Sequence, residues 1–170
     1  MYDAAVAQAR LPVFYTDYGV ADTLDGRFEM VVLHVTPLID GLRDEGGSLL
    51  PEGQALFDHF LSDMDQNLRT IGVGDLSIPK KMKKVGAAFY GRFDAYRRAM
   101  DDGDALAAAC ARNVLDAPDR PTSPEARALA RYMRALRDAA PGKLTPSPHF
   151  PDPARFVPDG AAVEAEGAAA

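Results

Sequence analysis

The sequence contains one cysteine and no tryptophan among its 170 residues. Because Cys110 has no second cysteine to pair with, an intrachain disulfide is excluded and the fold must depend on a packed core. Eight phenylalanines and six tyrosines supply the large side chains for that core. Cys110 lies within a run of alanines, which indicates a small core residue rather than a nucleophile. A reducing compartment is the simpler interpretation.

Long apolar runs are also missing. The most apolar stretch, Phe28–Leu42, is interrupted by Glu29, His34, Pro37 and Asp40, so it is too short and too polar to span a bilayer. The N-terminus has no basic segment followed by an apolar run, and we expect no signal peptide. We therefore expect a cytoplasmic protein.

Sequence motifs of common enzymes are absent as well. There is no Gly-x-Ser-x-Gly, no Walker loop and no dinucleotide fingerprint, and Gly72 and Gly74 join two helical patterns rather than following a strand. The net charge of −6 argues against a general nucleic-acid binder. We expect no enzyme activity, no catalytic residue, no cofactor and no small-molecule substrate, and predict that the protein binds another macromolecule.

What is present is helical periodicity. No run of alternating β-branched residues occurs, so the sequence predicts an all-α fold. Helices are expected over 2–11, from Asp22 as N-cap to about Gly46, from Pro51 to about Ile71, from Ser77 to Gly103, from Asp104 as N-cap to about Leu115, and from Ser123 as N-cap to Pro141. Pro37 predicts a kink.

These helices predict a single domain over residues 1–140, an irregular bundle of five to seven helices. Residues 141–170 are rich in proline and alanine and predict an extended or disordered tail. The apolar stripes predict one buried cluster, made of Phe28, Val31, Val35, Phe57, Phe60, Met64, Phe89 and Phe93.

The helix after Ser77 is strongly basic. Seven basic residues and two acidic ones lie between Asp75 and Arg98, and Lys80, Lys84 and Arg98 fall nearly opposite the apolar stripe. An ordinary solvated surface would have this pattern. A docking face for an acidic partner, RNA or anionic lipid would have it too, since Gly86 and Gly91 would allow close approach.

A metal site is the weaker alternative. His59 and Asp63 are four residues apart on one predicted helix, and His34 could approach from the neighbouring one. Such loosely spaced residues are a weak signal, and a hydrogen-bonded core histidine is the more common role for His34. We therefore expect no metal.

The stretch Asp22–Met100 resembles the ubiquinol–cytochrome c chaperone family, the assembly factors for cytochrome b of the respiratory bc1 complex. The resemblance depends on DTLDGRFEMVVLHV (Asp22–Val35), ALFDHFLSDMDQNLRTIGVGDLSIPKKMKK (Ala55–Lys84) and AFYGRFDAYRRAM (Ala88–Met100). Its most specific part is DMD (Asp63–Asp65) followed by GVGDLS (Gly72–Ser77).

The resemblance implies a non-enzymatic all-α assembly factor that binds cytochrome b, nascent or newly inserted, or another assembly factor. A bacterial member would act at the inner face of the plasma membrane. The alternative is a ribosome- or RNA-associated regulator of cytochrome b synthesis that uses the basic helix 79–100. The candidate partner-binding residues are Lys80, Lys81, Lys84, Arg92, Arg97, Arg98, Asp63, Asp65 and Asp75.

Overall fold

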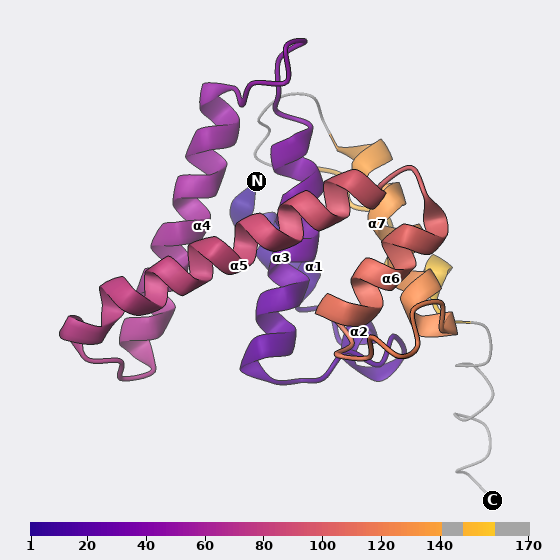
Figure 1. The fold of residues 1–170 in the computed structure, drawn as a ribbon, viewed down its shortest axis with the longest axis horizontal. Helices are drawn as coiled ribbons and strands as arrows, with labels where there is room; N and C mark the ends of the chain where they lie inside the picture. The colour runs from indigo at the N-terminus through magenta and orange to yellow at the C-terminus, as the bar shows by residue number, and fades with distance from the viewer. Residues whose placement is uncertain (141–147, 159–170) are drawn as a thin grey trace, which may run out of the picture.

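The computed structural model describes residues 1–140 and 148–158. Its helices are α1 (Tyr2–Ala9), α2 (Val13–Thr16), α3 (Leu24–Asp40), α4 (Pro51–Thr70), α5 (Ile78–Ala99), α6 (Gly103–Asn113) and α7 (Pro124–Ala139), with the short 3-10 helices η1 (Asp75–Ser77) and η2 (Pro153–Phe156). Over these residues there is no strand, only an isolated bridge between Arg43 and Leu49. The predicted all-α fold of five to seven helices is confirmed (Figure 1).

Helix α3 lies at the centre of the molecule. It begins after Thr23, whose hydroxyl oxygen accepts the N–H of Gly26 at 3.1 Å, so the predicted cap at Asp22 is wrong by one residue. Every residue from Met30 to Ile39 is buried, because α1, α4, α5 and α7 all pack against this helix. The helix continues through Pro37 and ends at Asp40, earlier than the sequence predicts.

Helices α6 and α7 form the other side of the molecule. Asp102, rather than the predicted Asp104, caps α6 by accepting the N–H groups of Asp104 and Ala105, both at 3.0 Å. Ser123 caps α7 as predicted. Cys110 is fully buried in α6, and burial raises the pKa of its thiol to about 12, which agrees with the predicted core role.

A segment near the C-terminus, residues 148–158, packs against α7 and against the chain that precedes α3. The hydroxyl of Tyr18 donates to the carbonyl oxygen of Pro153 at 2.7 Å, and Gln8 donates to that of Pro151 at 3.2 Å. The predicted extended or disordered tail, 141–170, otherwise lies outside the described residues. The sequence did not reveal that 148–158 packs against the helices, because proline-rich segments have no apolar period.

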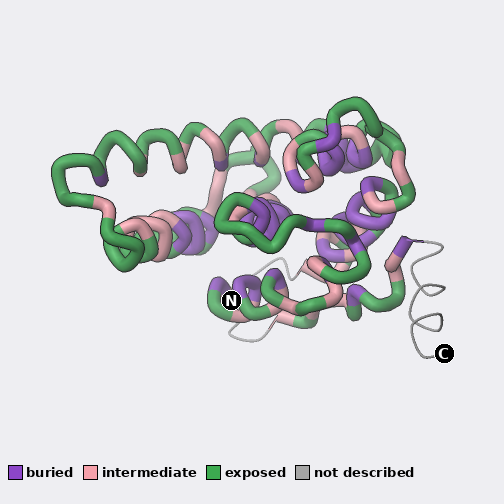
Figure 2. The backbone as a smooth tube through the Cα atoms, turned by 90° about the horizontal axis from the view of Figure 1, so that it is seen from below, coloured by how far each residue is buried: buried purple, intermediate pink, exposed green. Residues whose placement is uncertain are grey.

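Helices α4 and α5 form a hairpin of which only part packs on α3. The buried residues of α4 are Gly53, Leu56, Phe57 and Phe60, all in its first half. Those of α5 lie in its second half, except Ile78. We call the remainder, residues 61–88, the arm. Figure 1 shows the arm reaching away from α6 and α7, and Figure 2 shows its far end as exposed.

Candidate functional site

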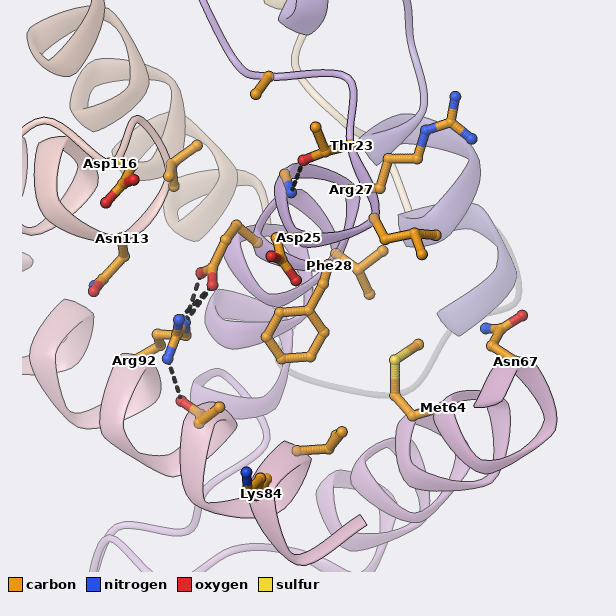
Figure 3. A pocket seen from close by; sticks show the side chains of 18 of the residues that line it. Thr23, Asp25, Arg27, Phe28, Met64, Asn67, Lys84, Arg92, Asn113 and Asp116 are labelled. Atoms are coloured by element: carbon orange, nitrogen blue, oxygen red, sulfur yellow. Dashed lines mark hydrogen bonds and ion pairs between the residues drawn. The ribbon is translucent and has the colours of Figure 1, made fainter. Parts of the chain in front are cut away.

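An open groove of about 930 Å³ lies between the arm and the body of the molecule. Its walls come from the start of α3, the second half of α4, the middle of α5 and the end of α6 with the turn after it (Figure 3). The start of α3 and the turn after α6 lie far in sequence from the α4–α5 hairpin, whose two helices are joined by a short turn. The groove exists because α4 and α5 extend beyond the region where α3 can cover them.

Apolar side chains line the groove, and they belong to the helical stripes from which the sequence predicts a buried core. Along α4, Phe57 and Phe60 are buried, Met64 and Leu68 are half-buried, and Ile71 is 57% exposed. The apolar stripe therefore continues along the whole of α4, but α3 covers only the first half of that helix. Uncovered apolar area of this kind is typical of a surface that binds a partner.

The predicted burial of Phe28 and Met64 is wrong, and the other six predicted core residues are buried. Both side chains are half-buried and point into the groove from opposite walls, as Figure 3 shows. Leu24, one turn before Phe28, is 70% exposed at the same wall. Helical spacing identifies an apolar face but not the element that covers it, so the sequence could not separate these residues from the core.

An ion pair between Glu29 and Arg92 closes one side of the groove. The Arg92 Nε lies 2.7 and 2.6 Å from the two carboxylate oxygens of Glu29, a residue that is only 6% exposed. Burial raises the pKa of the Glu29 carboxyl, and the Arg92 guanidinium acts in the opposite direction. The pair joins α5 to α3 and fixes the position of the wall. Nothing in the sequence pattern identifies Glu29 as a site residue.

Arg92, a candidate partner-binding residue of the basic helix, is therefore half-buried and does not lie on the exposed outer face of α5. A helical wheel places Arg92 at the margin of the basic face, but it cannot show that α3 presents a carboxylate to that margin. The guanidinium also lies 5.8 Å from the ring centre of Phe28. Arg92 lines the groove rather than the solvent side of α5.

The other predicted basic residues do not form one surface. Lys80, Lys81 and Lys84 are exposed on the arm, and Lys84 also lines the groove. At the other end of α5, about 27 Å from Lys80 along the helix axis, Arg98 pairs with Asp94 at 2.9 Å. Arg97 pairs with Asp40 of α3 at 3.2 Å.

The predicted acidic residues form hydrogen bonds and ion pairs with other residues of the protein. Arg69 of α4 bonds to Asp65 at 2.7 Å and to Asp75 of η1 at 2.6 Å, which ties the turn to the end of α4. Asp63 accepts a hydrogen bond from the hydroxyl of Tyr2 at 2.7 Å and lines the groove.

The structure does not bring together the residues of the metal alternative. His34 is fully buried, with Nδ1 2.7 Å from the carbonyl oxygen of Met30 and Nε2 2.9 Å from the hydroxyl of Tyr132. His59 is exposed and stacks on Tyr2. Across the described part of the chain, no three His, Cys, Asp or Glu side chains are grouped as metal ligands.

Two comparisons with known proteins agree on the family. The ubiquinol–cytochrome C chaperone family matches residues 16–141. A structure described as the crystal structure of the Cbp3 homolog from Brucella abortus is 40% identical in sequence and has a TM-score of 0.67. The match covers 81% of this chain and 76% of that one. No curated protein matches the chain at a significant level. The chain therefore belongs to the ubiquinol–cytochrome C chaperone family.

Proposed function

We infer that this protein is an assembly factor of the cytochrome bc1 complex that holds a segment of cytochrome b, or of another assembly factor, in the groove beneath the arm. Membership of a chaperone family implies a binding protein rather than an enzyme. The observation that supports the groove as the site is the apolar stripe of α4, which passes from buried to exposed while its helical spacing continues.

The groove suits an apolar or amphipathic segment. Phe28, Met64, Leu68 and Val85 offer apolar surface, and charged side chains such as Asp25 and Lys84 also lie among the lining residues. A groove that binds an amphipathic helix needs apolar surface for the apolar face of that helix. Newly made membrane segments of cytochrome b present apolar area of this kind before they are assembled.

A ribosome- or RNA-associated role is the second candidate, and the exposed lysines of the arm favour it. Lys80, Lys81, Lys83 and Lys84 are all exposed at one end of α5. However, the arginines further along α5 form ion pairs with the protein itself. The basic surface is therefore shorter than the helix, which weakens the case for a nucleic-acid track.

The test is co-purification from detergent-solubilised membranes. Leu24→Asp with Ile71→Asp changes two exposed residues that line the groove, so the melting temperature should barely change. Recovery of cytochrome b or a partner factor should fall about tenfold or more, because burying a carboxylate against an apolar client is unfavourable. Ala55→Asp with Ala105→Asp, at two exposed residues outside both the groove and the arm, is the matched control, because it adds the same two negative charges.

Undiminished recovery with the groove variant would contradict the proposed site. Recovery of ribosomal RNA instead of cytochrome b by the unaltered protein would favour the second candidate.

A further inference from the structure

An apolar side chain at the far end of the arm is fully exposed to solvent. Leu76, in the 3-10 helix η1 between α4 and α5, is 100% exposed. Figure 1 places this turn away from α6 and α7, and Figure 2 shows it exposed at one end of the molecule. A single exposed leucine is ordinary on a protein surface, so its meaning depends on its neighbours.

Those neighbours are four lysines. Lys80, Lys81, Lys83 and Lys84 occupy the first two turns of α5, all are exposed, and none forms an ion pair with any described residue. The acidic residue closest in sequence, Asp75, is held by Arg69 at 2.6 Å. The tip, residues 75–84, is therefore locally positive in a protein whose net charge is −6.

The lysines and Leu76 are presented on the same end of the arm. At 100° per residue, the four lysines share one side of α5, and Met82 and Val85 lie on the other. The latter two are half-buried. Lys80, Lys81 and Lys83 therefore point away from the protein, directly after the exposed leucine, and Lys84 lies beside them at the edge of the groove.

We propose that the tip binds the anionic surface of a membrane, with Leu76 entering the interfacial region and the four lysines contacting lipid phosphates. Lysines next to an exposed apolar residue fit a surface that is negative outside and apolar beneath. A nucleic acid fits less well. The tip has no aromatic or arginine side chain to stack on bases, and Leu76 would have no apolar partner on a phosphate backbone.

Membrane binding at the tip would hold the groove beside a bilayer, where an apolar client emerges. Among the described helices, none combines the length and apolarity needed to cross a bilayer. Leu76, Lys80 and Lys81 do not line the groove, so the tip and the proposed client site can be altered separately.

The experiment is flotation of the full chain with vesicles of phosphatidylcholine alone and with vesicles that also contain phosphatidylglycerol. Binding is expected only to the second kind and should decrease as NaCl is raised. Lys80→Glu with Lys81→Glu should lower the partition coefficient about 25-fold or more, since each lysine near an anionic surface contributes a factor of about five. Leu76→Ser should lower it about fivefold through lost apolar burial.

Arg120→Glu with Arg155→Glu is the matched control, because it makes the same change in net charge at exposed residues outside the tip. Absence of vesicle binding by the unaltered chain would overturn the proposal. An equal loss of vesicle binding in this control would overturn it as well. Binding of a ribosomal RNA fragment by the unaltered chain without any vesicle binding would also overturn it, in favour of a nucleic-acid partner.

Discussion

His34 shows how a single buried residue is tied to the fold. The carbonyl oxygen of Met30 can only accept, so His34 Nδ1 carries the proton and donates to it at 2.7 Å. Nε2 is then unprotonated and accepts from the Tyr132 hydroxyl at 2.9 Å, which in turn accepts from Gln8 at 3.0 Å. This chain of hydrogen bonds joins α1, α3 and α7 and requires a neutral imidazole.

The neutral imidazole predicts that stability falls in mild acid. Burial lowers the pKa of His34 from 6.5 to about 4, so between those values the unfolded chain binds a proton that the folded chain does not. The free energy of unfolding should therefore fall, by roughly 3 kcal/mol from this residue, as the pH drops through that interval. Denaturant unfolding at a series of pH values measures it.

Other groups also titrate in acid, so the comparison that isolates His34 is with His34→Gln, which can hydrogen-bond but does not take up a proton. The stability advantage of the unaltered protein over this variant should shrink as the pH falls. His59→Gln, at an exposed ring, is the control for the exchange of a histidine for glutamine. A constant difference between the unaltered protein and His34→Gln would contradict this account of His34.

At the scale of elements, the arm is less firmly held than the rest of the α4–α5 hairpin. The first half of α4 and the second half of α5 share a cluster in which the ring of Phe89 lies 4.9 Å from those of Phe57 and Phe60. Beyond Leu61 no residue of α4 is buried. Stability against local opening follows buried apolar contact, so it should decrease along the hairpin toward its turn.

Amide hydrogen exchange should resolve this difference. Amides of the arm, within 61–88, should exchange through local opening with a lower free energy than those of α5 after Phe89. Added client peptide should raise the protection of the arm because it supplies the missing cover. Equal protection along the whole of α5 in the free protein would show that the arm is held by contacts other than buried apolar ones.

Helical spacing predicted most of these elements because each has a periodic apolar stripe, and the cap at Ser123 follows from its side chain. It could not predict the groove. Phe28 and Met64 satisfy the same spacing as Phe57, and only the relative positions of α3 and α4 decide which of them is covered. The Glu29–Arg92 pair was missed for the same reason, because a contact between helices leaves no period in either one.

At the scale of the whole molecule, the body, the groove and the basic tip follow one another along one direction. The body, built on α3, α6 and α7, is compact and hydrogen-bonded to the segment 148–158. The groove lies between body and arm, and the basic tip lies at the far end of the arm. In the proposed arrangement the tip contacts the membrane while the groove holds the client next to it.

The central claim, that the groove beneath the arm serves bc1 assembly, is tested most directly in a strain from which the gene has been deleted. The measured quantity is bc1 activity per amount of membrane protein, together with the level of cytochrome b, after complementation at equal chaperone levels. The unaltered gene and the control variant Ala55→Asp, Ala105→Asp should both restore cytochrome b and bc1 activity. The Leu24→Asp, Ile71→Asp variant should leave bc1 activity close to that of the deletion strain. Full restoration by that groove variant would contradict the account.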